Sequence, residues 1–225
     1  MAHVFDKIDT WLFDLDETLY PPSLALFEQI DAKMTRYVME YLDVPHDVAD
    51  QLRADYWRDY GTTLAGLMEN HGMAPGTFLD IVHDIDLSHI EPDHALISAI
   101  DALPGRKLVF TNGSLGHAKN VTTALGMDHL FEAFYSIEDT GFVPKPSEAA
   151  FDIIFEMANI QTQKTAFFED SAKNLAVPAA RGMQTILVRE GVKAPDYVNH
   201  HAASLEDALT HIHNHLSQSS VRNIP

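Results

Sequence analysis

Between about residue 99 and residue 190, short apolar runs alternate with helical stretches, and this alternation constrains the fold more than any other feature of the chain. A further apolar run precedes it near the N-terminus. Alternation of strands and helices is typical of a parallel sheet with helices on both faces. We therefore predict an α/β fold, a doubly wound, Rossmann-like parallel sheet. The expected strands cover residues 7–14, 107–111, 133–136, 165–168 and 185–188, and helices are expected to begin near residues 116, 147 and 171.

A long helical insertion separates the first expected strand from the second. Asp14 and Thr111 lie 97 residues apart, far more than a single crossover between parallel strands needs. Residues 43–45 and 72–76 contain the breaks that divide this stretch into separate helices. We predict a helical cap over residues 21–98, inserted into a core of residues 1–20 and 99–225. The apolar positions at spacings of three and four are Leu24, Phe27, Ile30, Met34, Tyr37, Val38 and Tyr41.

Composition excludes several kinds of function. The 225 residues contain no cysteine, which rules out disulfides, thiolate nucleophiles and cysteine-based zinc sites. The formal net charge of −18 repels polyanions, so we expect no nucleic-acid polymer as a partner, and an anionic substrate must find local positive charge. We see no signal peptide and no apolar stretch of membrane-spanning length. We expect a soluble cytoplasmic protein, a monomer or homodimer without a membrane partner.

Two carboxylates follow directly after the first apolar run. Asp14 and Asp16 follow Phe13, and the period of two puts them on the same side of an extended backbone, with Thr18 next. One carboxylate of such a pair can attack or bind metal while the other moves a proton. Alone, this pattern is equally compatible with a strand followed by an acidic turn.

Three further signals follow in order along the chain, each where a strand is expected to end. They are Thr111-Asn112-Gly113, Lys145 between two prolines, and Glu169-Asp170 after an apolar run. Open parallel sheets bind their ligands outside the carboxyl ends of the strands. We therefore expect these side chains to meet Asp14 and Asp16 in one site.

This ordered set resembles the haloacid dehalogenase-like (HAD) hydrolase superfamily, subfamily I, from about residue 8 to residue 188. The resemblance implies a C1-type helical cap, with Asp14 as the nucleophile that forms an aspartyl-phosphate and Asp16 as the general acid/base. The fourth motif begins Glu169-Asp170, a variant of the commoner Asp-Asp or Gly-Asp. Dehalogenation is disfavoured, because that branch lacks the second acid that Asp16 supplies.

The resemblance also assigns the ligands. Thr111, Asn112 and Lys145 are expected to hold the substrate phosphate. Mg²⁺ suits the oxygen-rich set and is the expected cofactor. Its expected ligands are Asp14, the backbone carbonyl of Asp16, Asp170, and Glu169 either directly or through water.

The cap carries aromatic residues beside an arginine, and such a group can stack on a nucleobase or form an ordinary helix face. The phrase Tyr-Gly-Thr-Thr-Leu-Ala-Gly-Leu at residues 60–67, with His-Asp-Ile-Asp at 83–86, resembles the pyrimidine 5′-nucleotidase branch. We therefore predict a Mg²⁺-dependent phosphomonoesterase, a phosphatase acting on UMP and CMP. The expected specificity residues are Tyr56, Trp57, Arg58, Tyr60, Thr62 and Thr63.

Alternatives remain open at this point. One is a phosphatase or phosphomutase for another small phosphate ester, such as a sugar phosphate or phosphoglycolate, because cap specificity is poorly encoded in one sequence. Another is a catalytically silent binding protein on the same scaffold. His211, His213 and His215 alternate near the C-terminus, but only His211 and His215 share a helix face, so we expect solvent-facing histidines rather than a metal site.

Overall fold

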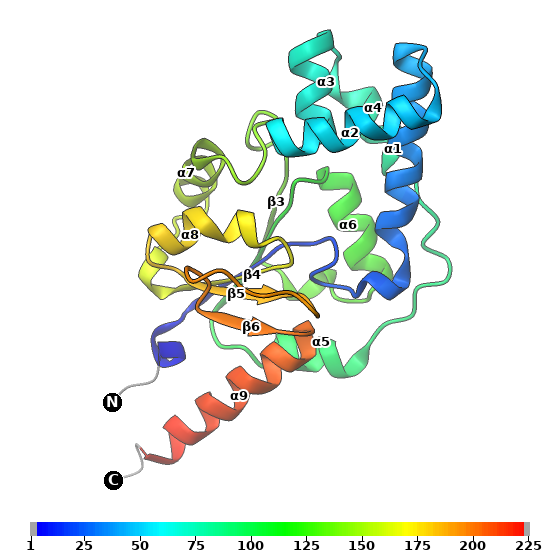
Figure 1. Ribbon diagram of the computed structural model, residues 1–225. Helices are drawn as coiled ribbons and strands as arrows, with labels where there is room; N and C mark the ends of the chain where they lie inside the picture. The colour runs from blue at the N-terminus through cyan, green and yellow to red at the C-terminus, as the bar shows by residue number, and fades with distance from the viewer. Residues whose placement is uncertain (1–3, 223–225) are drawn as a thin grey trace.

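A six-stranded parallel sheet forms the centre of the molecule in the computed structural model, which describes residues 4–222 (Figure 1). The strand order is β3-β2-β1-β4-β5-β6, so the first strand lies in the middle of the sheet. The predicted α/β fold class is confirmed. The strands are β1 (Thr10–Phe13), β2 (Arg106–Phe110), β3 (Ala133–Tyr135), β4 (Thr165–Glu169), β5 (Gln184–Val188) and β6 (His200–Ala202).

Both faces of the sheet are buried. Trp11 and Phe13 of β1 point to one face, where helices α5 (His94–Asp101), α6 (Leu115–Ala124) and α9 (Leu205–Arg222) pack. Leu12 points to the other face, which α7 (Glu148–Met157) and α8 (Ala176–Ala180) cover. This alternation follows from the period of two along a strand. Double burial explains why the strands are continuous apolar runs rather than alternating ones.

Four helices form the cap, which lies above the carboxyl edge of the sheet (Figure 1). They are α1 (Leu26–Leu42), α2 (His46–Tyr60), α3 (Thr63–His71) and α4 (Pro75–Val82), and they share a third apolar cluster. The predicted breaks fall between α1 and α2 and between α3 and α4. Helix α5 packs against the sheet through Leu96 and Ile100, so the change from cap packing to core packing falls before it. The division into domains stays a prediction.

Several element boundaries differ from the prediction. The first strand begins at Thr10 rather than at residue 7, because Val4–Lys7 forms a 3₁₀ turn, η1, with Phe5 buried. The short edge strand β6 and the break at Gly61, between α2 and α3, were not predicted. Over residues 4–222, no helix has the length and apolar character required to cross a bilayer.

Candidate active site

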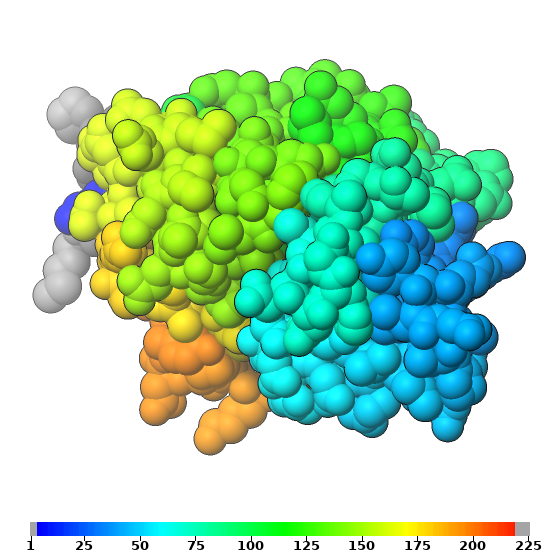
Figure 2. Space-filling model, turned by 90° about the horizontal axis from the view of Figure 1, so that it is seen from above, coloured from blue at the N-terminus to red at the C-terminus, as the bar shows by residue number. Residues whose placement is uncertain are grey.

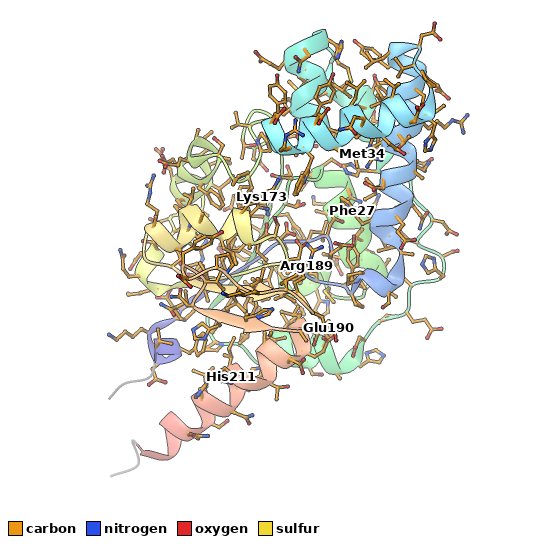
Figure 3. The ribbon with its side chains drawn as sticks, in the orientation of Figure 1. Phe27, Met34, Lys173, Arg189, Glu190 and His211 are labelled. Carbon is orange, nitrogen blue, oxygen red and sulfur yellow. The ribbon has the colours of Figure 1, made fainter. Side chains whose placement is uncertain are left out.

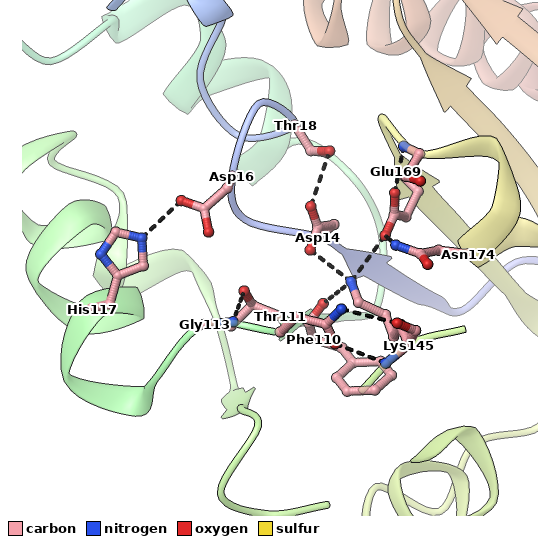
Figure 4. Close-up of polar contacts among 12 residues, drawn as sticks. Asp14, Asp16, Thr18, Phe110, Thr111, Gly113, His117, Lys145, Glu169 and Asn174 are labelled. Atoms are coloured by element: carbon pink, nitrogen blue, oxygen red, sulfur yellow. Dashed lines mark hydrogen bonds and ion pairs between the residues drawn. The ribbon is translucent and has the colours of Figure 1, made fainter. Parts of the chain in front are cut away.

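The predicted motif residues meet at the carboxyl edge of the sheet (Figure 4). Asp14 directly follows β1, Thr111 directly follows β2, and Glu169 ends β4. Because β2 and β4 are the two neighbours of β1, their ends bring these side chains together. Lys145 reaches the same place from the loop after β3. The structure thus gathers residues from four separate segments of the chain.

Lys145 is the charged centre of this group. Its Nζ lies 2.6 Å from Oδ1 of Asp14 and 3.0 Å from Oε1 of Glu169, and it donates to the backbone carbonyl of Phe110 at 2.8 Å. The residue is 1% exposed. Burial alone lowers the pKa of Lys145, but Asp14 and Glu169 raise it by more, so the ammonium group stays charged.

Glu169 is the second carboxylate that holds Lys145. Its Oε1 also accepts from Nδ2 of Asn174 at 2.6 Å, and its Oε2 accepts from the backbone N–H of Ser171 at 2.6 Å. Both carboxylate oxygens are therefore engaged within the protein. The sequence predicted Glu169 as a metal ligand, direct or through water, and this arrangement fits the second form better.

Thr111 and Asn112 were both predicted to bind phosphate, and they lie differently. Thr111 is buried, and its Oγ1 accepts from the backbone N–H of Gly113 at 2.9 Å. The Asn112 side chain accepts from the backbone N–H of Lys145 at 2.8 Å and donates to the Lys145 carbonyl at 3.1 Å. Its amide thus orients the lysine loop. Asn112 also lines the cavity described below, and phosphate binding by Asn112 stays a prediction.

Three carboxylates could share a cation at this edge. Oxygens of Asp14, Glu169 and Asp170 all lie within 4.8 Å of one another. Burial is the main cause that raises the pKa of Asp14 to about 7 and that of Asp170 to about 9, with neighbouring carboxylates adding to it. Arg189 offsets only part of this charge, at 3.3 Å from Asp170. A hard divalent cation fits this excess of buried oxygen donors.

Asp16 lies beside the cluster but has different partners. Its Oδ1 accepts from Nε2 of His117 at 2.7 Å and from the hydroxyl of Tyr20 at 2.7 Å. Burial raises the pKa of Asp16, but these two contacts lower it by more, so the net pKa lies below its usual value.

Sequence reasoning missed both partners of Asp16. It considered a metal site only for the histidines near the C-terminus, and it gave no role to His117 or to Tyr20. A signal was present for His117, which stands three residues after the N-cap Ser114 of α6, in the first turn of a helix that directly follows a motif strand.

A cavity of about 880 Å³ opens from these residues into the cap. In Figure 3, Phe27 and Met34 project from α1 toward the space in which Lys173 and Arg189 lie. Viewed from above in Figure 2, the blue and cyan cap abuts the green and yellow-green atoms of the core. Gly61 makes this close approach possible: a Cβ there would lie 3.2 Å from the carbonyl oxygen of Lys145, and its φ of 88° favours glycine.

The six predicted cap residues divide into two groups. Trp57, Arg58, Thr62 and Thr63 line the cavity. Tyr56 and Tyr60 are not among the described residues that line it, which corrects their predicted role. The Tyr56 ring packs inside the cap and its hydroxyl lies 2.7 Å from Nε2 of His71, whereas the Tyr60 hydroxyl donates to Asn70.

Trp57 joins the cap to the core across the cavity. The ammonium group of Lys173 lies 3.2 Å from the centre of its indole ring, a cation–π contact. Arg58 pairs with Asp55 and Asp59 on the same helix. The sequence left open whether this group stacks on a nucleobase or forms an ordinary helix face. Trp57 lines the cavity, as stacking would require, and Arg58 is ion-paired along its own helix, as on an ordinary helix face.

The histidines of α9 lie away from this site. His211 is exposed, and its ring packs edge-on against His215, 4.2 Å between centroids. His213 is half-buried, with Nε2 2.8 Å from the carbonyl oxygen of Ala99, so it does not face solvent freely as predicted. Within residues 4–222, the strand-end cluster is the one group of acids and histidines close enough to share a metal.

Comparison with known proteins shows the family and agrees with the fold. The chain belongs to the haloacid dehalogenase-like hydrolase family, whose model matches residues 8–182. It is 24% identical over 195 residues to "Phosphate metabolism protein 8" of Saccharomyces cerevisiae, covering 79% of this chain and 60% of that protein's length.

Two solved structures share the architecture. The HAD-hydrolase YfnB from Bacillus subtilis, described as bound to magnesium, has a TM-score of 0.63 at 20% identity, covering 91% of this chain and 98% of its own. A HAD phosphatase from Thermococcus onnurineus has a TM-score of 0.62 at 12% identity, with coverage of 91% and 98%. At these identities the likeness concerns the fold.

Proposed function

We propose that this hydrolase is a Mg²⁺-dependent phosphomonoesterase that hydrolyses pyrimidine nucleoside 5′-monophosphates, UMP and CMP, through an aspartyl-phosphate. The observation that carries the proposal is the buried Lys145–Asp14 ion pair of 2.6 Å, at the base of a cavity of about 880 Å³. A lysine fixed beside a carboxylate nucleophile supplies the positive charge that a phosphate group needs in a chain of net charge −18. The name of the yeast relative, which refers to phosphate metabolism, is in line with this activity.

The proposed chemistry has two steps. An oxygen of Asp14 attacks phosphorus while the P–O bond of the ester breaks. Asp16, after taking up a proton from solvent, gives that proton to the leaving alkoxide. Water then attacks the aspartyl-phosphate, its proton passes to Asp16, and inorganic phosphate leaves as the bond to Asp14 breaks. Lys145 stabilises negative charge on the phosphoryl oxygens throughout.

The acids at the strand ends would hold the metal. Asp14, Asp170 and the backbone carbonyl of Asp16 are the proposed direct ligands, with Glu169 acting through water. When bound, Mg²⁺ supplies positive charge that lets an anionic ester approach the Asp14 carboxylate.

The proposed base-binding end is the cap side of the cavity. Its walls are mostly apolar, and Arg53 is the buried cation among them. The guanidinium donates to Thr35 and Asp31, but its Nε is buried without a hydrogen-bond partner among the described residues. A cavity of this size also suits a nucleotide better than phosphoglycolate.

Relative kcat/KM values for UMP, CMP, AMP and GMP test the substrate. We expect pyrimidines to exceed purines by at least about tenfold, which needs only about 1.4 kcal/mol of differential transition-state binding. Trp57→Ala should flatten this ratio while hydrolysis of p-nitrophenyl phosphate survives. Tyr60→Ala is the matched control, because Tyr60 is an exposed aromatic residue on the same helix that does not line the cavity.

Other outcomes identify the alternatives. A higher kcat/KM for a sugar phosphate than for UMP would contradict the proposed specificity but leave the core chemistry in place. Failure to hydrolyse any phosphate ester in the presence of Mg²⁺ would favour a silent binding protein. The proposal places the enzyme in the cytoplasm as a monomer or homodimer that acts on a small phosphorylated metabolite, and these points stay predictions.

A further inference from the structure

Two linkers connect the cap to the core, and each sends a side chain toward Asp16. The outgoing linker carries Tyr20, whose hydroxyl donates to Oδ1 of Asp16 at 2.7 Å. The returning linker begins at His83, directly after α4. The His83 ring stacks on the ring of His117, and His117 contacts the same carboxylate. Asp16 therefore lies where both connections between cap and core converge.

The contact between His117 and Asp16 is fixed from the core side. His117 is 2% exposed, and its Nε2 lies 2.7 Å from Oδ1 of Asp16. Oδ1 of Asp16 only accepts hydrogen bonds, both when the carboxylate is ionised and when its proton is on Oδ2, so Nε2 carries the proton and donates. Gly113 leaves room for this arrangement, since a Cβ there would lie 3.1 Å from the His117 ring.

The contact between His83 and His117 crosses from cap to core. The two imidazole rings stack with centroids 4.4 Å apart and planes 12° from parallel. Nδ1 of His83 also lies 2.9 Å from Oγ of Ser114, the residue that caps α6. Burial, with a further contribution from His117, lowers the pKa of His83 to about 3. The His83 ring is therefore neutral near pH 7, and its Nδ1 shares a hydrogen bond with the hydroxyl of Ser114.

The two oxygens of Asp16 have different surroundings. Oδ1 takes both hydrogen bonds, from His117 and from Tyr20. Oδ2 lies on the side of Gly113 and Thr111, both of which line the cavity. Oδ2 is thus the oxygen that can exchange a proton with a bound ester.

We propose that His83, through His117, and Tyr20 are positioning residues that orient the carboxylate of Asp16 according to where the cap sits. With the cap in the described position, Oδ1 is held and Oδ2 faces the phosphate end of the cavity. The proton on Oδ2 then passes to the ester oxygen as the P–O bond breaks. Loss of the cap contact releases the carboxylate. This inference rests on the proposed function, in which Asp16 is the general acid/base.

A comparison of leaving groups tests the inference, because an alkyl phosphate needs protonation of its leaving group far more than p-nitrophenyl phosphate does. We expect His83→Ala to lower kcat/KM for the alkyl ester by about tenfold more than for p-nitrophenyl phosphate. His83→Phe keeps a ring against His117 and should stay within about threefold of the unaltered protein on both esters. In an Asp16→Asn background, His83→Ala should lose its selective effect, because the two act in series.

His71→Ala is the matched control. His71 is also a cap histidine beside an aromatic ring, but it contacts Tyr56 rather than His117. Its loss should change both esters by the same factor. Equal loss of both esters in His83→Ala, or persistence of the selective loss in the Asp16→Asn background, would overturn the inference.

A second measurement does not depend on activity. The hydrogen-bonded Nε2–H of His117 should give a downfield proton resonance in the NMR spectrum, identified by its absence in His117→Gln. His83→Ala should shift or broaden this resonance, whereas His71→Ala should leave it in place. An unmoved resonance in His83→Ala overturns the coupling. If the unaltered protein hydrolyses neither ester, the proposed function fails, and the spectrum still decides whether cap and carboxylate are coupled.

Discussion

Nζ of Lys145 lies 2.6 Å from Oδ1 of Asp14, although 131 residues separate the two in the chain. Both side chains are buried, and Glu169 completes the group at 3.0 Å from the same ammonium. A buried charge without a partner is costly, so the three charges depend on one another.

Asp14→Asn should abolish turnover and leave the fold intact. Asparagine is nearly isosteric but cannot attack phosphorus, so the covalent route is lost. Lys145 keeps Glu169 as its partner, which limits the structural effect. Steady-state hydrolysis of p-nitrophenyl phosphate with a matched circular dichroism melt checks both parts. Near-normal activity would refute the assignment of the nucleophile.

Asp16→Asn should lower the rate by about 10²–10⁴, because it removes the proton donor. Phosphoenzyme formation should suffer less with p-nitrophenyl phosphate than with an alkyl phosphate, since the better leaving group needs less protonation. Rapid-quench measurement of the phosphoenzyme with each ester separates the two. An equal loss for both esters would argue against the acid role.

Lys145→Met should destabilise the protein by about 3–5 kcal/mol in the absence of Mg²⁺, because it leaves two buried carboxylates without their cation. Part of this loss should be recovered with Mg²⁺, which brings replacement positive charge. Urea denaturation with EDTA or with Mg²⁺ measures both effects.

The matched control is Lys164→Met. Lys164 pairs with Asp9 at 3.8 Å, and both side chains are about half exposed. Its loss should cost less than about 1 kcal/mol and should not depend on Mg²⁺. If the two lysine variants behaved alike, the buried charge balance inferred for Lys145 would be wrong.

The stabilisation by Mg²⁺ should grow with pH. Burial raises the pKa of Asp14 to about 7 and that of Asp170 to about 9, so the metal-free folded state holds protons that the unfolded chain has already released. These two groups therefore make the metal-free protein less stable as pH rises from about 4 to about 9. A metal competes with those protons for the same carboxylates.

Thermal melts with EDTA and with Mg²⁺ at several pH values measure this effect. The difference in Tm between the two conditions should widen from about pH 6 to about pH 9, and Asp170→Asn should reduce the widening. A difference that is constant across this range would contradict the prediction.

The strands and the motif order could be predicted from the chain alone. A parallel sheet buried on both faces needs continuous apolar runs. Each run here ends in a polar residue that the packing of the sheet does not require. Asp14, Thr111 and Glu169 were therefore expected at one edge, and the strand order of the structure brings them there. The breaks at residues 43–45 and 72–76 likewise follow from local backbone preferences, which act within a few residues.

Residues whose positions depend on packing between cap and core could not be predicted. Tyr56 directly precedes Trp57 and Tyr60 follows it by three residues, yet of the three only Trp57 lines the cavity, because the rotation of α2 is set by its contacts with α1 and α3. The sequence likewise gave no sign that the side-chain amide of Asn112 would be paired with the backbone of Lys145, 33 residues away.

His83 and His117 lie 34 residues apart in the sequence, on different sides of the cap–core boundary, and no local pattern relates them. Their stacking exists because α4 ends directly above the first turn of α6. Periodicity and strand-end chemistry act over short segments and so determined the sheet, the helical insertion and the acids of the candidate site. The orientation of the cap on the core is a property of long-range packing, and it alone decided which side chains surround the cavity and hold Asp16.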